Sequence, residues 1–264
     1  MIDSLRDYIA LLRNKNLLLE VAEQVYREDL PELIDSLQGS GKALLFTDVA
    51  GYSGRVAANL VPSQACFADI FETNVNHYDY FINALKRREK KLPAVEHDLT
   101  SIAMEGRELM DYLPILKHYE QDSAPFITAA IASSRDPETG AVARGIHRLE
   151  WRKGNRMGIA LLNPPLSELR EKYQLLQRPM PISLSIGNDL AVLLAMALKP
   201  QLDTDKLEIA GGLKGRGIAT INSFDSGIDV RNAGRHQAHG LPALVTRSAA
   251  RYPRQRADSG AAAL

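Results

Sequence analysis

The sequence has one cysteine and no formal net charge. Each of these features excludes a class of protein. Cys66 is the single cysteine among 264 residues, which excludes an internal disulfide and a metal cluster held only by cysteines. It has no base nearby in the sequence, and we interpret it as a buried, inert thiol. Lysine plus arginine balance aspartate plus glutamate at 32 each, so overall charge gives no reason to expect nucleic acid as a partner.

Long apolar runs are also missing. No uninterrupted stretch approaches the roughly 20 apolar residues that a membrane-spanning helix needs. The first 16 residues mix acidic and basic side chains in an amphipathic pattern, unlike a secretory signal. With 45% hydrophobic and 24% charged residues, the chain is long enough for one large domain or two smaller ones. We therefore expect a cytoplasmic protein with no membrane span.

The first hundred residues predict a small α/β unit. Asp29 before Pro31 is a candidate N-cap for a helix that ends at Leu37. Apolar runs at 43–46 and 56–61 predict strands. Two groups of apolar residues recur at helical spacing and predict two short helices, one at Leu5, Ile9 and Leu12 and one at Leu17, Val21 and Val25.

Residues 70–91 predict a further helix. It ends in a basic run, whose simplest interpretation is a solvated helix end that complements the helix dipole. From residue 113 onward the pattern changes to short segments separated by turns. Strands are predicted at 126–132, 141–151, 156–162, 182–186 and 217–222, and helices at 166–176 and 189–198. This order is not that of a parallel doubly wound sheet.

The segment 113–148 is the most informative part of the chain. Pro137 presets a turn and Gly140 can supply positive φ between two apolar runs, which predicts a hairpin. The second strand ends on Arg148, beside Gly145 and within reach of Thr128 across the hairpin. An arginine there can form a bidentate pair with a phosphate or carboxylate. The alternative is an ordinary surface arginine.

Other motifs carry less weight. The run Gly39-Ser40-Gly41-Lys42 lacks the hydroxyl residue of a phosphate-binding loop and precedes a strand. The glycines at 211, 212, 215 and 217 lack dinucleotide-motif spacing, so we interpret them as a turn. No zinc spacing links the histidines, which include His77, His97, His118, His236 and His239.

Five stretches, in this order and spacing, carry a resemblance to a known family: 44–60 (LLFTDVAGYSGRVAANL), 113–128 (LPILKHYEQDSAPFIT), 136–148 (DPETG followed by GIHR), 181–198 (PISLSIGNDLAVLLAMAL) and 209–219 (IAGGLKGRGIA). Together they resemble the N-terminal and central parts of UbiD-type decarboxylases, which use prenylated FMN. The resemblance implies an α/β (α+β) fold. It places a small N-terminal α/β domain at 1–110 and a flavin-reductase-like split β-barrel that binds the cofactor at 111–230.

The resemblance also implies site residues. Arg148 matches the family's catalytic arginine, and the cofactor contacts carried over are Thr128, Gly145, Ile146, His147, Arg148 and Pro165. The family's metal ligands are not matched, because Ala143 stands for an asparagine and Leu166 for a histidine. Alanine and leucine offer no oxygen or nitrogen to a divalent metal such as manganese. Either the chain holds the flavin phosphate without metal, through Arg144 or His147, or it binds the cofactor in another way.

Residues 231–264 depart from the family pattern and carry six arginines between Arg231 and Arg256 against one acid, Asp258. One interpretation is a basic tail for an anionic partner. The other, which we favour, is a disordered stretch that has left the family frame.

The resemblance implies a non-oxidative decarboxylase of an aromatic or α,β-unsaturated carboxylic acid. It also implies a flavin prenyltransferase that supplies prenylated FMN, and homo-oligomers. Glu150 is the carboxylate nearest to Arg148 on the same strand face and a weak candidate for the proton donor. The alternative is a flavin-nucleotide-binding or assembly subunit without catalysis, which the residues Ala143 and Leu166 favour.

Overall fold

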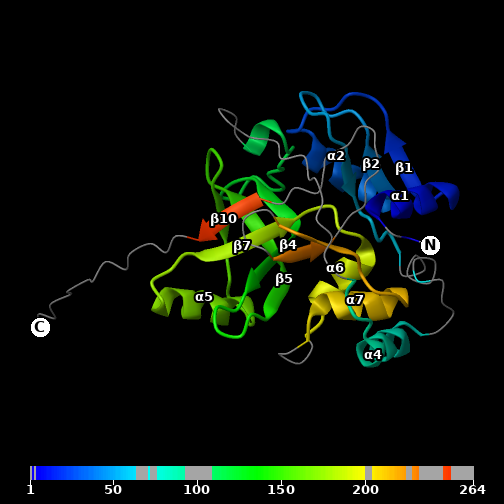
Figure 1. Cartoon of the computed structure of the whole chain (residues 1–264). Coiled ribbons are helices and arrows are strands. Elements are labelled where there is room, and N and C mark those ends of the chain that lie inside the picture. The colour runs from blue at the N-terminus through cyan, green and yellow to red at the C-terminus, as the bar shows by residue number, and fades with distance from the viewer. Residues whose placement is uncertain are drawn as a thin grey trace, which may run out of the picture.

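The computed structural model describes residues 2, 4–63, 71, 76–92, 109–199, 204–223, 228–231 and 246–250. Cys66, His97, His236 and His239 lie outside these residues, so the interpretations given for them stay predictions. The described residues form three sheets with helices packed around them (Figure 1). Within them, no helix combines the length and the apolar character needed to cross a membrane.

The N-terminal unit is a three-stranded sheet of order β1-β2-β3. Its elements are α1 (Leu5–Asn14), β1 (Leu18–Val21), α2 (Leu30–Leu37), the 3-10 turn η1 (Gln38–Ser40), β2 (Ala43–Phe46) and β3 (Val56–Ala58). The central strand β2 is buried along its whole length. Because side chains alternate along a strand, Ala43 and Leu45 pack toward α1, whereas Leu44 and Phe46 pack toward α2.

One prediction for this unit is wrong, and the predicted helix from Asp29 to Leu37 is confirmed without its side-chain cap. The apolar residues from Leu17 to Val25 do not form a second helix, because Asn16 ends α1 in the left-handed region at φ 57° and Leu18–Val21 then pairs in parallel with β2. The pairing satisfies the backbone and buries Leu18, which outweighs a weak helical spacing. Asp29 does precede α2, but its side chain makes no capping hydrogen bond.

The central unit is a curled five-stranded sheet of order β10-β7-β4-β5-β6, with all neighbours antiparallel. Its strands are β4 (Phe126–Arg135), β5 (Val142–Trp151), β6 (Met157–Ile159), β7 (Met180–Ser185) and β10 (Thr246–Ala250). The β4–β5 hairpin predicted from the sequence is confirmed, and Gly140 takes φ 75° in its turn. Residues 246–250 form β10 although disorder was expected there; most of the remaining tail lies outside the described residues.

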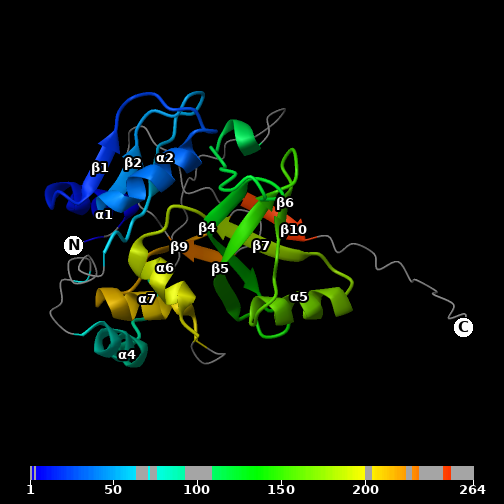
Figure 2. The same cartoon turned by 180° about the vertical axis from the view of Figure 1, so that it is seen from behind.

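Helices cover both faces of this sheet (Figures 1 and 2). The remaining elements are α4 (His77–Arg87), η2 (Leu109–Asp111), α5 (Leu166–Leu175), α6 (Leu190–Ala197), α7 (Lys206–Lys214), β8 (Thr220–Asn222) and β9 (Asp229–Arg231). Ile131 of β4 packs with α6 and α7. Its neighbours Ala130 and Ala132 face the other side, toward α5. The predicted helices at 166–176 and 189–198 are therefore confirmed with small changes at their ends.

Helix α7 is a helix that the sequence interpretation missed. Gly211 and Gly212 lie inside it rather than in a turn. A Cβ on Gly212 would stand 2.5 Å from the backbone oxygen of Ala84 in α4. The two glycines are therefore needed for close packing between helices, not for a turn conformation. The helix predicted at 70–91 also differs, because α4 ends at Arg87 and Lys91 turns back to the ion pairs described below.

Candidate functional site

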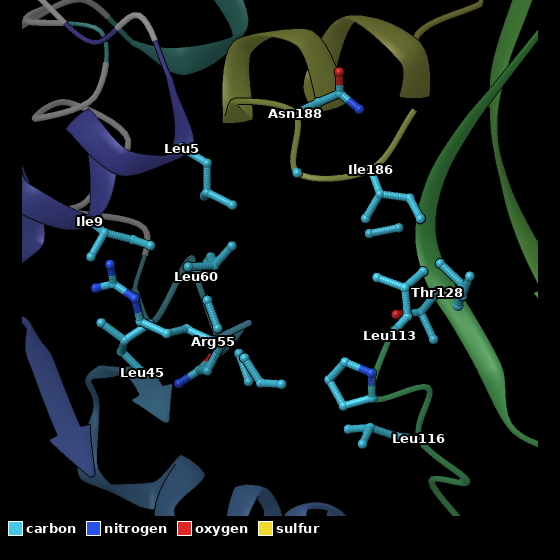
Figure 3. Close-up of a pocket in the computed structure, with 18 of the residues that line it drawn as sticks. Leu5, Ile9, Leu45, Arg55, Leu60, Leu113, Leu116, Thr128, Ile186 and Asn188 are labelled. Atoms are coloured by element: carbon cyan, nitrogen blue, oxygen red, sulfur yellow. The ribbon is translucent and has the colours of Figure 1, made fainter. Parts of the chain in front are cut away.

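A cavity of about 720 Å³ separates the N-terminal unit from the central unit. That size is typical of small-molecule sites. One wall comes from α1 and the β2–β3 hairpin, and the other from residues 113–118, the start of β4 and the loop between β7 and α6. Figure 3 shows Leu5, Ile9 and Leu60 facing Leu113, Ile186 and Thr128 across the opening. The two units are thus arranged to enclose a largely apolar ligand.

Thr128 reaches this cavity because the β4–β5 pairing is irregular at that point. The register shifts between Ile127 and Ala130, so Thr128 and Ala129 are both exposed and both line the cavity. A bulge of this kind redirects side chains that regular pleating would send to opposite faces. The bulge lies opposite Arg148, as the hairpin prediction required.

Arg148 does not line the cavity itself but stacks on a residue of the same wall. Its guanidinium carbon lies 5.2 Å from the centroid of the Phe126 ring, and Phe126 lines the cavity. Cation–π stacking holds the side chain without consuming its hydrogen-bond donors. Arg148 is exposed, and among the described residues it forms no ion pair. The guanidinium is therefore available to an anionic group of a ligand.

The other predicted cofactor contacts divide between the two faces of β5. Ile146 shares the face of Arg148 and is 38% exposed. Gly145 and His147 face the other way: a Cβ on Gly145 would lie 3.2 Å from His147 Nε2 and 4.0 Å from Leu166. Pro165 lies beyond β6, at the N-cap of α5. Strand alternation thus separates Gly145 and His147 from Arg148.

His147 is half-buried, with its Nδ1 3.2 Å from the carbonyl oxygen of Ala160. Burial lowers the pKa of its imidazole, the Ala160 carbonyl opposes this by favouring the charged form, and the ammonium of Lys206 lowers the pKa further. The imidazole is therefore held in its neutral form near pH 7 and can both donate and accept a hydrogen bond.

The two positions of the family metal ligands lie in one apolar cluster. Ala143 and Leu166 pack in one hydrophobic cluster with Leu149 and Leu169. Among the described residues, no group of three histidines, cysteines, aspartates or glutamates comes together as a metal site. These residues do not fit a divalent metal, because hard cations require oxygen or nitrogen donors.

Arg144 is not a phosphate ligand, contrary to one expectation. Its side chain is 2% exposed and pairs with Asp205 at 3.0 Å and with Asp229 at 2.9 Å. The hydroxyl of Ser133 lies 3.2 Å from the same guanidinium, and Lys91 bridges the two carboxylates from the other side. This charge cluster, Lys91, Ser133, Arg144, Asp205 and Asp229, ties β4, β5, α7 and β9 together and leaves Arg144 no donor for a ligand.

Glu150 is also occupied. Its carboxylate accepts a hydrogen bond from Ser123 at 2.6 Å and pairs with Arg152 at 2.6 Å. No ion pair joins it to Arg148 in the described part of the chain. The proton-donor role considered for Glu150 therefore has no support in the geometry.

Sequence interpretation missed the N-terminal wall of the cavity. Arg55, Ile9 and Leu60 line it from elements that precede the hairpin by more than sixty residues. No local pattern marks them, because their proximity to Thr128 depends on how the two units pack.

The fold and the sequence both resemble proteins of known class. The structure superposes on the UbiD-class enzyme HmfF from Pelotomaculum thermopropionicum in complex with FMN with a TM-score of 0.79 and 31% identity, over 86% of this chain and 52% of that one. An evolved dimeric form of HmfF in complex with prenylated FMN gives a TM-score of 0.82 and 28% identity, over 93% and 63%. The predicted α/β (α+β) fold with a split β-barrel is thereby confirmed, and the barrel takes the form of a curled half-barrel sheet.

Named relatives are decarboxylases. The anhydromevalonate phosphate decarboxylase of Methanothermobacter thermautotrophicus is 34% identical over 105 residues, 40% of this chain and 25% of the relative. A phenolic acid decarboxylase of Streptomyces sp. (strain D7) is 24% identical over 251 residues, 86% of this chain and 52% of the relative. The chain thus spans about half the length of the Streptomyces relative and a quarter of the length of the Methanothermobacter relative.

Two family models match in succession. Residues 9–85 match the 3-octaprenyl-4-hydroxybenzoate carboxy-lyase N-terminal domain. Residues 88–233, more than half of the chain, match the Rift-related domain of the same carboxy-lyase. Together with the superposition on UbiD-class enzymes, these matches show that the chain belongs to the UbiD family.

Proposed function

We propose that the chain acts in the non-oxidative decarboxylation of an aromatic or α,β-unsaturated carboxylic acid with prenylated FMN as cofactor. The observation that carries the proposal is the guanidinium of Arg148, which is exposed and unpaired among the described residues, next to a cavity of about 720 Å³. Family membership and the flavin-bound HmfF structures support the choice of cofactor. When bound, prenylated FMN supplies a carbon that bonds to the substrate and holds the electrons left by carbon dioxide.

The chain's own residues would bind and orient the acid. Arg148 would pair with the substrate carboxylate through two parallel hydrogen bonds, and Thr128 would donate a further one from the bulge. The apolar walls around Ile186 and Leu113 exclude water, which strengthens both contacts. Loss of the carboxylate charge as carbon dioxide leaves would then release the product from Arg148. We assign no proton donor, because Glu150 is held by Ser123 and Arg152.

We also propose that the cofactor phosphate is held without a divalent metal. The apolar cluster that Ala143 and Leu166 share supports this. On the face of β5 that points away from Arg148, Gly145 and the neutral imidazole of His147 would contact the cofactor. Pro165, at the N-cap of α5, would contact it from the same side. Dialysis against EDTA should then leave the amount of bound flavin unchanged, whereas a metal-dependent site would release it.

A flavin-nucleotide-binding or assembly subunit without catalysis is the second candidate. The missing metal ligands favour it, since flavin binding alone needs no group to protonate carbon. In either case we propose a cytoplasmic protein that self-associates, in line with the dimeric form of HmfF, and that receives its cofactor from a flavin prenyltransferase.

Co-expression with a flavin prenyltransferase tests both candidates. The purified chain should carry flavin absorbance and release carbon dioxide from cinnamate. An Arg148→Met variant should keep the flavin and lose carbon dioxide release, whereas Arg178→Met, at an exposed arginine between α5 and β7, should behave as the parent. Bound flavin without carbon dioxide release in the parent would favour the non-catalytic subunit. A colourless chain would contradict both.

A further inference from the structure

The charged residues of the cavity all have the same sign. Among the described residues that line it, the basic side chains are Arg6, Arg13, Arg55 and His118, and none is an aspartate or glutamate. The three arginines come from the N-terminal unit, on α1 and just before β3. The cavity therefore has a cationic side opposite the bulge that carries Thr128, with apolar side chains between them.

Arg13 and Arg55 differ in how their charges are compensated. Arg13 is neutralised by Glu20, whose two oxygens accept from its Nε at 2.6 Å and its Nη2 at 2.9 Å. Arg55 is exposed and forms no ion pair among the described residues. The pKa of Glu20 is lowered, and the largest cause is the hydrogen bond from Arg13. The charge of Arg55 is the smallest of the causes that lower this pKa. Glu20 is thus paired with Arg13, and in the described part of the chain no carboxylate forms an ion pair with Arg55.

The position of Arg55 fits a ligand rather than bulk solvent alone. In Figure 3 its side chain runs along the N-terminal wall toward Ile9, while Thr128 faces the cavity from the opposite wall. Leu45 and Leu60 flank it. Once a ligand fills the cavity and displaces water from the exposed guanidinium, the hydrogen bonds from Arg55 to an anion would strengthen, because the local dielectric would fall.

We propose that the substrate of this chain carries a second anionic group, a carboxylate or a phosphate, and that Arg55 binds it. This inference rests on the proposed function, in which Arg148 and Thr128 bind the carboxylate that is lost. The ligand would then have an unsaturated apolar body that spans the cavity and an anion at each end. Arg55 would be a specificity-determining residue of the N-terminal unit.

Isothermal titration of the whole chain with matched acids tests the inference. The probes are cinnamate, which has one carboxylate, 4-carboxycinnamate, which has two, and 4-phosphonooxycinnamate, in which a phosphate replaces the second carboxylate. The parent chain should bind at least one of the doubly anionic probes about tenfold more tightly than cinnamate, or better, as expected for hydrogen bonds to a charged group. The better of the two identifies the preferred anion.

Arg55→Met should abolish this preference and leave the affinity for cinnamate unchanged, because methionine keeps the aliphatic packing without the charge. The matched control is Arg178→Met, which should retain the preference. Equal affinity for all three probes in the parent, no measurable binding of any probe, or a preference that survives Arg55→Met would each overturn the inference.

The titrations are run with and without bound FMN, so that two failures can be told apart. A chain that does not take up FMN but still prefers the doubly anionic probe through Arg55 contradicts the proposed cofactor and supports the second-anion site. A chain that holds FMN and binds cinnamate through Arg148, with no preference for the second anion, contradicts only the role of Arg55.

Discussion

The guanidinium of Arg144 pairs with the carboxylate of Asp205 at two points, with Nε 3.0 Å from Oδ1 and Nη2 3.3 Å from Oδ2. Asp205 also caps α7 by accepting a hydrogen bond from the amide of Leu207. One buried arginine thus fixes the start of α7 against β5, the strand that carries Arg148 four residues later. The charge cluster positions the wall of the candidate site from behind.

Arg144→Met should be strongly destabilising. Among the described residues, it leaves two carboxylates that are 16% and 14% exposed with Lys91 as their remaining cation, and breaking a largely buried pair in this way typically costs about 3–5 kcal/mol. Urea unfolding should show a lower midpoint with an unchanged slope. Arg178→Met, at an exposed site, should change the free energy of unfolding by less than about 0.5 kcal/mol. A similarly small effect for Arg144→Met would show that the cluster contributes little to stability.

The same cluster should make stability sensitive to acid. Burial works against ionisation of Asp205, but the charge and hydrogen bonds of Arg144, the ammonium of Lys91 and the amide of Leu207 outweigh it and lower its pKa. Asp229 shifts in the same direction, also against burial and chiefly because of Arg144. A carboxyl with a lowered folded-state pKa stabilises the fold above its unfolded pKa, about 4, and loses that contribution as the pH falls further.

Measurements of the free energy of unfolding from pH 6 to pH 3 should therefore fall steeply for the parent chain below about pH 4. Asp205→Asn keeps the helix cap, since asparagine is an equally good N-cap, but removes the charge. Its profile should start lower and be flatter in this window. Parallel profiles for the two proteins would mean that Asp205 has an ordinary pKa.

The hairpin and the two helices after it could be predicted from the sequence because their signals are local. Pro137 and Gly140 mark the turn, and Asp189 accepts the capping hydrogen bond of α6 from the amide of Val192. Helix α7 could not be predicted, since Gly211 and Gly212 weaken its intrinsic propensity. Only packing against Ala84, far away in the sequence, explains why glycine is placed there.

The residues of the candidate site also fall into those that local sequence predicts and those that depend on tertiary packing. Arg148 and Thr128 lie on paired strands, so the register of one hairpin brings them together. Arg55 belongs to another sheet, and its place in the cavity depends on tertiary packing between the two units. Arg144 lies within the recognised motif, so the sequence suggested a role in ligand binding. Its actual partner is the carboxylate of Asp205, 61 residues away in the chain.

Gly212→Ala should destabilise the chain although alanine is the better helix former. In an exposed helix this change gains about 0.5–1 kcal/mol. At this position the new Cβ would stand 2.5 Å from the backbone oxygen of Ala84, and a backbone atom cannot move aside cheaply, so a net loss of about 1–3 kcal/mol is expected. The matched control is Gly39→Ala in η1, where a Cβ meets nothing within 4 Å. Thermal unfolding that is unaffected or raised in Gly212→Ala would show that α4 and α7 can separate.

His147 should titrate below an ordinary histidine and make the fold sensitive to mild acid. Burial lowers its pKa from 6.5, with an opposing effect of the Ala160 carbonyl and a further lowering by Lys206. The unfolded chain then takes up a proton at a higher pH than the folded chain does. The contribution of His147 is therefore complete above about pH 6.5 and declines as the pH falls through the interval between the two pKa values.

Proton NMR of the imidazole Cε1–H resonances follows this titration directly, and the resonance that disappears in His147→Gln belongs to His147. Its midpoint should lie below pH 6.5. The free energy of unfolding of His147→Gln should also fall less between pH 7 and pH 5 than that of the parent. A midpoint at or above 6.5 would place the imidazole in contact with water or with an anion. In that case the face of β5 that carries Gly145 and His147 would be open, and the neutral imidazole assigned to the cofactor side would have to be abandoned.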